Sequence, residues 1–162
     1  MKAIDFLSLL EVNGFDFFTG VPCSYFAPLL EILNQRDTSV HVTAVREDIA
    51  VGLAVGARMA GKSPVVYMQN SGLGYSLEAF ASLPLIYYIP LLVLVSYRGP
   101  DDQGWEEHLV MGQHTEDLLR SFGMRYSVFR GEISSPEINE IKEYLVREEL
   151  PHVLLVTKGA LQ

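Results

Sequence analysis

The sequence predicts an α/β protein: one three-layer domain in which a six-stranded, mainly parallel sheet carries helices on both faces. Six short apolar runs alternate with segments of helical period, which is the order of strands and crossover helices in a parallel sheet. The runs are almost continuously apolar, as expected for strands that are covered on both sides. Because 162 residues suit one domain of this kind, we expect a single domain over residues 1–162.

Turn-forming residues bound each apolar run, and each run has the length of a strand. We predict strands at Phe15–Thr19, Val40–Val45, Pro64–Gln69, Leu91–Ser96, Met124–Phe129 and His152–Thr157. In a parallel sheet the carboxyl ends of the strands share one edge, and ligands of such folds bind there. The residues that follow the first four runs are therefore the candidates for function.

Apolar residues recur every three to four positions between these runs, which predicts helices. Met1–Asn13 carries charged residues among its apolar positions, so we expect an amphipathic helix there rather than a signal peptide. The others are expected at Tyr25–Gln35, Asp48–Ala60, Leu73–Ser82, Gly112–Phe122 and Pro136–Val146. Gly14, Gly61 and Gly123 stand where three of the helices should end.

Charge, cysteine content and hydropathy exclude several classes of function. With a formal net charge of -8, the chain has no general attraction for the phosphates of nucleic acids. Cys23 is the only cysteine, which excludes intrachain disulfides and zinc sites built from several thiolates. The most apolar stretch, Leu83–Ser96, is too short to span a bilayer, so we expect a cytoplasmic protein. A hydrophobic share of 49% suggests apolar surface that a partner chain covers.

Glycine turns follow the first and third runs. Gly20 and Pro22 predict a tight, stiff turn after the first run, and Ser24 can cap the helix behind it. After the third run, Asn70–Gly74 predicts a glycine loop ahead of a helix, a geometry that offers backbone amides to an anion or a polar ring. Leu77 stands where a dinucleotide-binding fingerprint needs its third glycine, so this loop alone indicates no nucleotide site.

An acidic pair, Glu47 and Asp48, follows the second run and opens a helix. Acidic residues in a first turn complement the helix dipole, and that alone can explain them. The helix places Gly52, Gly56 and Ala60 on one face, although each glycine costs about 1 kcal/mol relative to alanine. Such a face indicates a tight interface, and a carboxylate held in this apolar place can exchange a proton near neutral pH.

The loop after the fourth run contains glycine, proline, four acidic residues and the only tryptophan. It can be a solvated loop without function. Arg98, His108 and His114 nevertheless follow one strand end, where they could meet an anionic substrate. The two histidines lack the i, i+4 spacing of a helical metal pair, so we expect no metal site formed by this chain alone.

Together these segments resemble the pyrimidine-binding (PYR) domain of thiamine diphosphate enzymes, above all the sulfopyruvate decarboxylase alpha subunits and the phosphonopyruvate decarboxylases. The residues that carry the resemblance are Thr19–Ser24, Arg46–Glu47, Val66–Gly74, Arg98–Gly99 and Gly112–Thr115. Among them the string Met-Gln-Asn-Ser-Gly-Leu-Gly, at positions 68–74, is the most specific. They spread over most of the chain in the order of the family.

The resemblance implies a decarboxylase that converts 3-sulfopyruvate to sulfoacetaldehyde and CO2, or that acts on 3-phosphonopyruvate. It implies that Glu47 is catalytic, through a hydrogen bond to N1′ of the pyrimidine ring of the cofactor. The implied contacts of thiamine diphosphate are Gly20, Pro22, Glu47, Asn70, Gly72, Leu73 and Gly74. Ser24 is implied as a contact of the substrate carboxylate, and Arg98, His108 and His114 as contacts of its sulfonate or phosphonate.

In this family a separate PP domain holds the diphosphate and Mg²⁺ through a Gly-Asp-Gly motif, and this sequence contains no Gly-Asp. The resemblance therefore implies a beta subunit that carries the motif, in a hetero-oligomer such as α2β2 or larger, with a shared active site. The acidic segment 101–107 is interpreted as a lid or a partner contact. Two alternatives stay open: a carboligase subunit of the acetolactate synthase type, and a non-catalytic α/β regulatory subunit.

Overall fold

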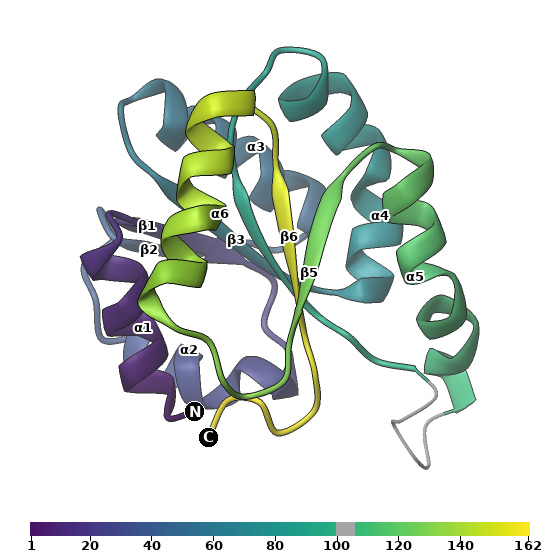
Figure 1. Cartoon of the computed structure of the whole chain (residues 1–162), viewed down its shortest axis with the longest axis horizontal. Helices are drawn as coiled ribbons and strands as arrows, with labels where there is room; N and C mark the ends of the chain where they lie inside the picture. Colours follow the sequence, from purple (N-terminus) through teal and green to yellow (C-terminus); the bar gives the residue numbers. More distant parts are fainter. Residues whose placement is uncertain (100–105) are drawn as a thin grey trace.

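Figure 1 shows the computed structural model of the chain, which describes residues 1–99 and 106–162. In this part of the chain six strands form one sheet, in the order β2-β1-β3-β4-β6-β5, and every pairing is parallel. The strands are β1 (Phe17–Gly20), β2 (His41–Thr43), β3 (Pro64–Gln69), β4 (Leu92–Ser96), β5 (Arg125–Phe129) and β6 (His152–Val156). The predicted sheet is confirmed, with strand ends that differ by one or two residues.

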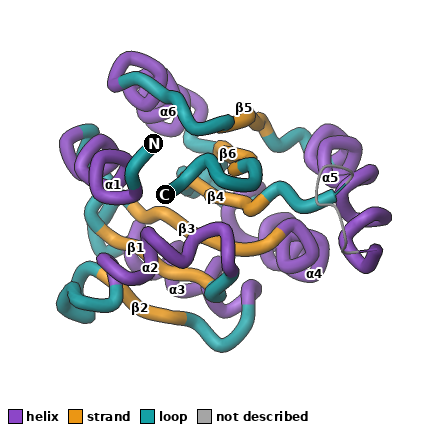
Figure 2. The backbone as a smooth tube through the Cα atoms, turned by 90° about the horizontal axis from the view of Figure 1, so that it is seen from below, coloured by secondary structure: helices purple, strands orange, loops and turns teal. Residues whose placement is uncertain are grey.

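Helices cover both faces of the sheet, as Figures 1 and 2 show. They are α1 (Ala3–Val12), α2 (Ala27–Leu33), α3 (Glu47–Met59), α4 (Asn70–Phe80), α5 (Leu109–Ser121) and α6 (Ser135–Glu148). Three short helical turns accompany them: η1 (Ser24–Phe26), η2 (Ala81–Leu85) and η3 (Glu106–His108). Across residues 1–99 and 106–162, no helix combines the length and the apolar character needed to cross a membrane.

Two hydrophobic cores fill the space between the three layers. One lies between the sheet and α1, α2 and α6, and the other lies between the sheet and α3, α4 and α5. Along β3, Val65 and Tyr67 belong to the first core, whereas Val66 and Met68 belong to the second. Because both faces are covered, β4 and β6 are buried at every position, which explains why they are apolar except for Ser96 and His152 at their ends.

The chain changes direction across the sheet between β1 and β3. From β1 it continues to β2 on one side, and it then crosses back to β3 on the other side. The helix that follows β1 and the helix that follows β3 consequently pack on opposite faces of the sheet. At such a switch point the carboxyl ends of the strands border a crevice between the helices, which is where parallel α/β folds bind ligands.

One prediction for this edge is wrong. β3 ends at Gln69 and α4 begins at Asn70, so residues 70–74 form the start of a helix and not a glycine loop. The glycines there are explained by their neighbours. A Cβ on Gly72 would clash with the Glu47 side chain, and one on Gly74 would lie 2.8 Å from the Cε of Met111.

Gly20 marks a close approach between β1 and β3, and it generates a prediction about stability. A Cβ there would clash with the Tyr67 carbonyl and lie 2.5 Å from a Tyr67 ring carbon. Because Gly20 and Tyr67 are paired in the ladder, the backbone has little freedom to separate. We predict that Gly20→Ala lowers the free energy of unfolding by about 1–3 kcal/mol, as measured by urea denaturation.

Gly52→Ala is the matched control, because a Cβ on Gly52 would meet no atom within 4 Å. This helical position should tolerate alanine, with a gain of up to about 1 kcal/mol from helix propensity. Equal losses of stability in the two variants would contradict the assignment of Gly20.

His152 makes stability depend on pH. It is 3% exposed, its Nε2 lies 2.9 Å from the Oγ of Ser127, and burial, reinforced by the charge of Arg125, lowers its pKa to about 4. In the unfolded chain the pKa returns to about 6.5, so between these values only the unfolded state binds the proton. Stability therefore falls as the pH falls from about 6.5 to about 4, by about 3 kcal/mol at most.

The change is measured by urea denaturation at pH 7 and pH 4.5, in the wild type and in His152→Gln. We expect the variant to lose less stability between the two pH values than the wild type loses. If both proteins lose the same amount, another group causes the dependence.

Candidate active site

Glu47 is the first residue of α3, and its side chain turns toward α4. A Cβ placed on Gly72 would lie 2.5 Å from the Cγ and 2.6 Å from the Cδ of Glu47, so the carboxyl group rests against the backbone of α4. Gly72 is buried and Glu47 is partly buried. The absence of a side chain at position 72 is therefore what allows Glu47 to occupy this place, where the first turns of α3 and α4 meet.

Asp48 points elsewhere, although it follows Glu47 directly. Its carboxylate forms an exposed ion pair with Arg46, in which Nη2 and Oδ2 are 2.5 Å apart, and this hydrogen bond lowers the pKa of Asp48. The Arg46 guanidinium also lies 5.4 Å from the centre of the Tyr75 ring. Of the acidic pair, only Glu47 faces buried backbone.

Asn70 is fully buried and joins the start of α4 to the end of β4. Its Nδ2 donates to the carbonyl oxygen of Arg98 at 2.6 Å and to the Oγ1 of Thr115 at 3.1 Å. Its Oδ1 is also buried and has no hydrogen-bond partner. Asn70 therefore holds the chain beyond β4 in place, and its side-chain oxygen is left as an acceptor for a further group.

Two glycines allow α5 to approach this network. A Cβ on Gly99 would lie 2.6 Å from the Cα of Gly112, so backbone contacts backbone where α5 passes the end of β4. Thr115, one turn further along α5, thereby comes within reach of Asn70. Both glycines belong to the family motifs found in the sequence, but no sequence pattern predicted that Gly99 and Gly112 are in contact.

Arg98 contacts residues from two other segments of the sequence, Ser24–Tyr25 and His108. Its Nη2 donates to the Ser24 hydroxyl, its Nη1 lies 3.3 Å from the Nε2 of His108, and its guanidinium carbon lies 4.4 Å from the centre of the Tyr25 ring. Arg98 is 8% exposed. Ser24 is not the N-cap of η1, which is Cys23, so the predicted capping role is wrong and its hydroxyl accepts from Arg98 instead.

His114 is not brought to this cluster. It is exposed on α5, on a different side of the helix from the buried Gly112 and Thr115. The predicted lid over residues 101–107 falls largely outside the described residues, because only its last two positions belong to them, and those are exposed.

The remaining predicted contacts differ in exposure. Gly20 is buried at the end of β1, and Pro22 is exposed in the turn that follows. The side chain of Leu73 is fully buried in the core beneath α4. Gly74 faces Met111. Their roles toward a ligand stay predictions.

The edge of the sheet thus carries two chemical features. Glu47 presents a carboxyl group that can hydrogen-bond a polar ring, and the Arg98 cluster presents donors that suit an anion. Within residues 1–99 and 106–162, no three His, Cys, Asp or Glu side chains gather as ligands for a metal ion.

Residues 3–124 match the family described as thiamine pyrophosphate enzyme, N-terminal TPP binding domain. The alpha subunit of sulfopyruvate decarboxylase from Methanothermobacter thermautotrophicus is 37% identical over 135 residues, which are 83% of this chain and 82% of that protein. Two longer relatives are also similar. Sulfopyruvate decarboxylase from Methanosarcina acetivorans is 27% identical over 93% of this chain and 38% of its own length. Phosphonopyruvate decarboxylase from Streptomyces hygroscopicus is 32% identical over 99% of this chain and 41% of its own length.

Among solved structures, a thiamine diphosphate-dependent 4-hydroxybenzoylformate decarboxylase from Rhodococcus jostii has the same fold. The TM-score is 0.71 at 17% sequence identity, over 98% of this chain and 30% of that chain. These matches confirm the family resemblance and the fold class predicted from the sequence.

The contact between Glu47 and Gly72 generates a prediction that needs no ligand. In Gly72→Ala the new methyl group takes the space of the Glu47 carboxyl, which should turn outward because it is the end of a flexible side chain. We expect the carboxyl ¹³C resonance of Glu47 to shift. The free energy of unfolding should stay unchanged or rise by up to about 1 kcal/mol, from helix propensity.

Gly112→Ala is the control, because the obstacle there is backbone and cannot turn away. We expect it to lose about 1–3 kcal/mol in urea denaturation. A loss of that size in Gly72→Ala, with an unchanged Glu47 resonance, would show that Glu47 is held rigidly.

Proposed function

This chain belongs to the thiamine pyrophosphate enzymes and carries their N-terminal TPP-binding domain, and from this premise we propose that it is the alpha subunit of a decarboxylase. The proposed substrate is 3-sulfopyruvate, which gives sulfoacetaldehyde and CO2, with 3-phosphonopyruvate as the alternative. The observation that carries the proposal is the Glu47 carboxyl group against Gly72, at the strand-end edge. The 37% identity to a sulfopyruvate decarboxylase alpha subunit supports the choice of substrate.

The residues around Glu47 fit the pyrimidine ring of thiamine diphosphate. The missing side chain at Gly72 leaves room for the Glu47 carboxyl group, which stays partly exposed, and the buried Oδ1 of Asn70 lacks a hydrogen-bond partner. When bound, the cofactor supplies an electron sink for the carbon that loses CO2. Glu47 would exchange a proton with a nitrogen of the bound ring and hold the ring in place. The proposed cofactor wall consists of Gly20, Pro22, Glu47, Asn70, Gly72, Leu73 and Gly74.

The Arg98 cluster is the proposed site for the charged ends of the substrate. A guanidinium group offers several N–H donors in one plane, which suits carboxylate, sulfonate and phosphonate oxygens. Ser24 and His108 lie within hydrogen-bonding reach of Arg98 and add further polar groups. His114 stays in this proposal on the family resemblance alone.

We propose that a second polypeptide completes the active site and holds Mg²⁺ and the diphosphate. This sequence contains no Gly-Asp, the dipeptide on which the PP domain of the family depends. The chain corresponds to 82% of a relative named as a subunit, but to 38% and 41% of the two longer decarboxylases. About three fifths of each longer relative therefore lies outside the region that matches this chain, which is enough for a further domain.

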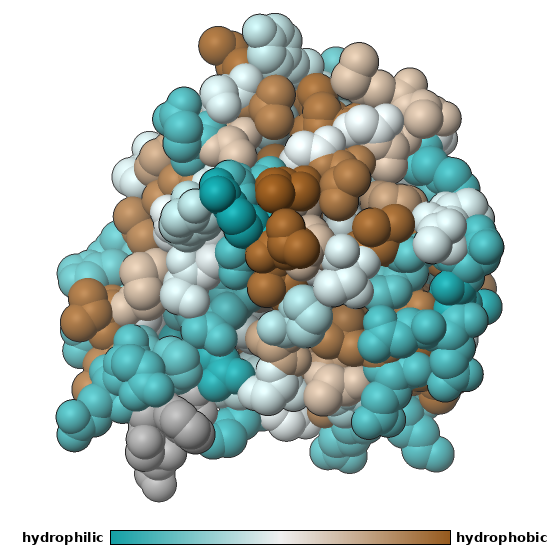
Figure 3. Space-filling view, turned by 180° about the vertical axis from the view of Figure 1, so that it is seen from behind, coloured by the Kyte–Doolittle hydropathy of each residue, from teal (hydrophilic) through white to brown (hydrophobic). Residues whose placement is uncertain are grey.

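The surface of α3 supports this partner. An apolar hollow there is lined by Phe17, Ile49, Gly52, Leu53, Gly56 and Ala57. Figure 3 shows the molecule from this side, where apolar side chains gather. Gly52 and Gly56 leave open space above the helix, into which a partner element can pack closely. The proposed assembly is α2β2 or larger, and we place it in the cytoplasm.

Glu47→Gln tests the proposal in the complex with the beta subunit, because glutamine keeps the size of the side chain and removes its acid. We expect the release of CO2 from 3-sulfopyruvate to fall by about 10²–10⁴-fold. Sulfoacetaldehyde should be the product of the wild type, whereas a carboligase would release a longer 2-hydroxy-3-oxo product.

Asp48→Asn is the matched control, since this neighbouring carboxylate pairs with Arg46 in solvent. Its turnover should stay within about threefold of the wild type, as expected for an exposed ion pair. Full activity in Glu47→Gln would overturn the mechanism.

A further inference from the structure

Tyr25 belongs to the Arg98 cluster, although the sequence did not single it out. The centre of its ring lies 4.4 Å from the guanidinium carbon of Arg98, a distance typical of a cation–π contact. Tyr25 is half-buried and Arg98 is 8% exposed, so much of this contact is shielded from water. A guanidinium that stacks on a ring keeps its N–H donors in the plane of the group, where they can still bind oxygen atoms.

The position of Tyr25 is set by the next residue, Phe26. This side chain is fully buried, and its ring packs edge-on against Tyr67 with the centroids 6.2 Å apart. The hydroxyl of Tyr67 is in turn 2.8 Å from the Nε2 of His41. Because η1 is a single tight turn, anchoring Phe26 also fixes the two residues before it, and both of them contact Arg98.

The other end of Arg98 is held independently. Its carbonyl oxygen accepts a hydrogen bond from Asn70 at 2.6 Å, and Asn70 belongs to α4. The side chain therefore extends from an anchor beside β3 and β4 to a second anchor beyond β1. A long arginine side chain that is already ordered loses less conformational freedom when an anion binds.

We propose that Tyr25 is a positioning residue that holds the Arg98 guanidinium ready for a sulfonate or phosphonate group. The inference rests on the function proposed above, because it concerns the same site. Without the ring, Arg98 keeps its charge but gains mobility and hydration. Removing the ring should therefore lower the affinity for the anion and leave the rate of the chemical step nearly unchanged.

The experiment uses the complex with the beta subunit and two substitutions, Tyr25→Leu and Tyr25→Phe. Sulfoacetate, an unreactive sulfonate, is titrated by calorimetry, and KM and kcat are measured for 3-sulfopyruvate. We expect Tyr25→Leu to weaken sulfoacetate binding and to raise KM by about tenfold, with kcat within about threefold. Tyr25→Phe, which keeps the ring, should behave like the wild type.

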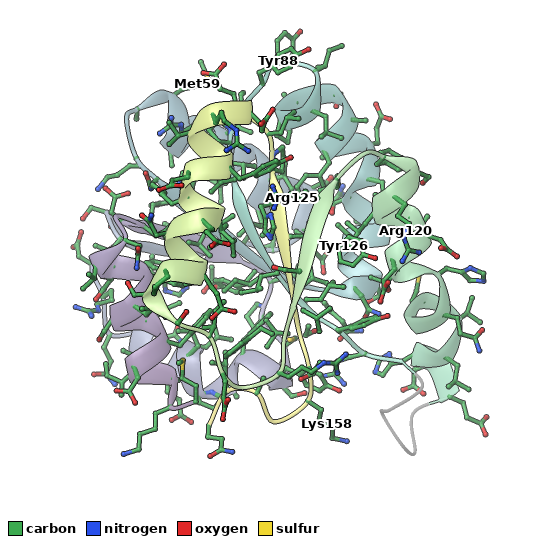
Figure 4. The ribbon with its side chains drawn as sticks, viewed as in Figure 1. Met59, Tyr88, Arg120, Arg125, Tyr126 and Lys158 are labelled. Atoms are coloured by element: carbon green, nitrogen blue, oxygen red, sulfur yellow. The ribbon has the colours of Figure 1, made fainter. Side chains whose placement is uncertain are left out.

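Tyr144→Leu is the matched control, because it removes a ring under another arginine. Arg125, labelled in Figure 4, lies with its guanidinium carbon 4.7 Å from the centre of the Tyr144 ring. This pair is at the amino end of β5, whereas Arg98 lies beyond the carboxyl end of β4. The control should bind sulfoacetate as the wild type does, even if its stability falls.

The titration separates this inference from the proposed function. A wild-type complex that binds sulfoacetate but releases no CO2 would refute the decarboxylase and leave Tyr25 testable by binding alone. Equal sulfoacetate affinities in the wild type and in Tyr25→Leu, or no binding to the wild type, would overturn the role of Tyr25. A loss in Tyr25→Phe as large as that in Tyr25→Leu would also overturn it, because the hydroxyl and not the ring would then matter.

Discussion

The close approach of the Glu47 carboxyl to the backbone of α4 is the contact on which the candidate site depends. It exists because α3 begins at Glu47, α4 begins directly after β3, and position 72 has no side chain. The carboxylate of the neighbouring Asp48 does not contact α4 in this way and instead forms an exposed ion pair with Arg46. Two adjacent acids thus receive different environments from a single turn of helix, and only one of them can meet a ligand against buried backbone.

The parallel sheet places the Arg98 cluster at the same edge as Glu47. Residues that follow β1, β3 and β4 meet there because these strands are neighbours and point in one direction. A backbone contact between two glycines reinforces this arrangement. Gly99 lies against Gly112, and this close approach lets Thr115 reach Asn70. The carboxyl group, the guanidinium and the amide between them are therefore positioned by the fold, before any ligand or partner chain contributes.

The alternation of apolar runs and helical segments was sufficient to predict the sheet, its parallel strands and the edge that carries the site. The expected loop at Asn70–Gly74 was wrong, because its glycines were interpreted by local turn chemistry. They are helix positions whose missing side chains make room for Glu47 and Met111, which are distant in sequence. The predicted capping role of Ser24 was wrong for a similar reason, because its hydroxyl accepts a hydrogen bond from Arg98, which is 74 positions away in the sequence.

The sequence by itself determined the fold class, the edge where chemistry-bearing residues gather, and the family to which the chain belongs. These follow from local periodicity and from short motifs, which a linear pattern can carry. Only the tertiary structure decided that Asp48 pairs with Arg46, that Ser24, Arg98 and His108 meet while His114 stays outside, and that Tyr25 lies against the guanidinium. Such choices depend on which side chains and glycines meet across distant segments, and no local pattern records those contacts.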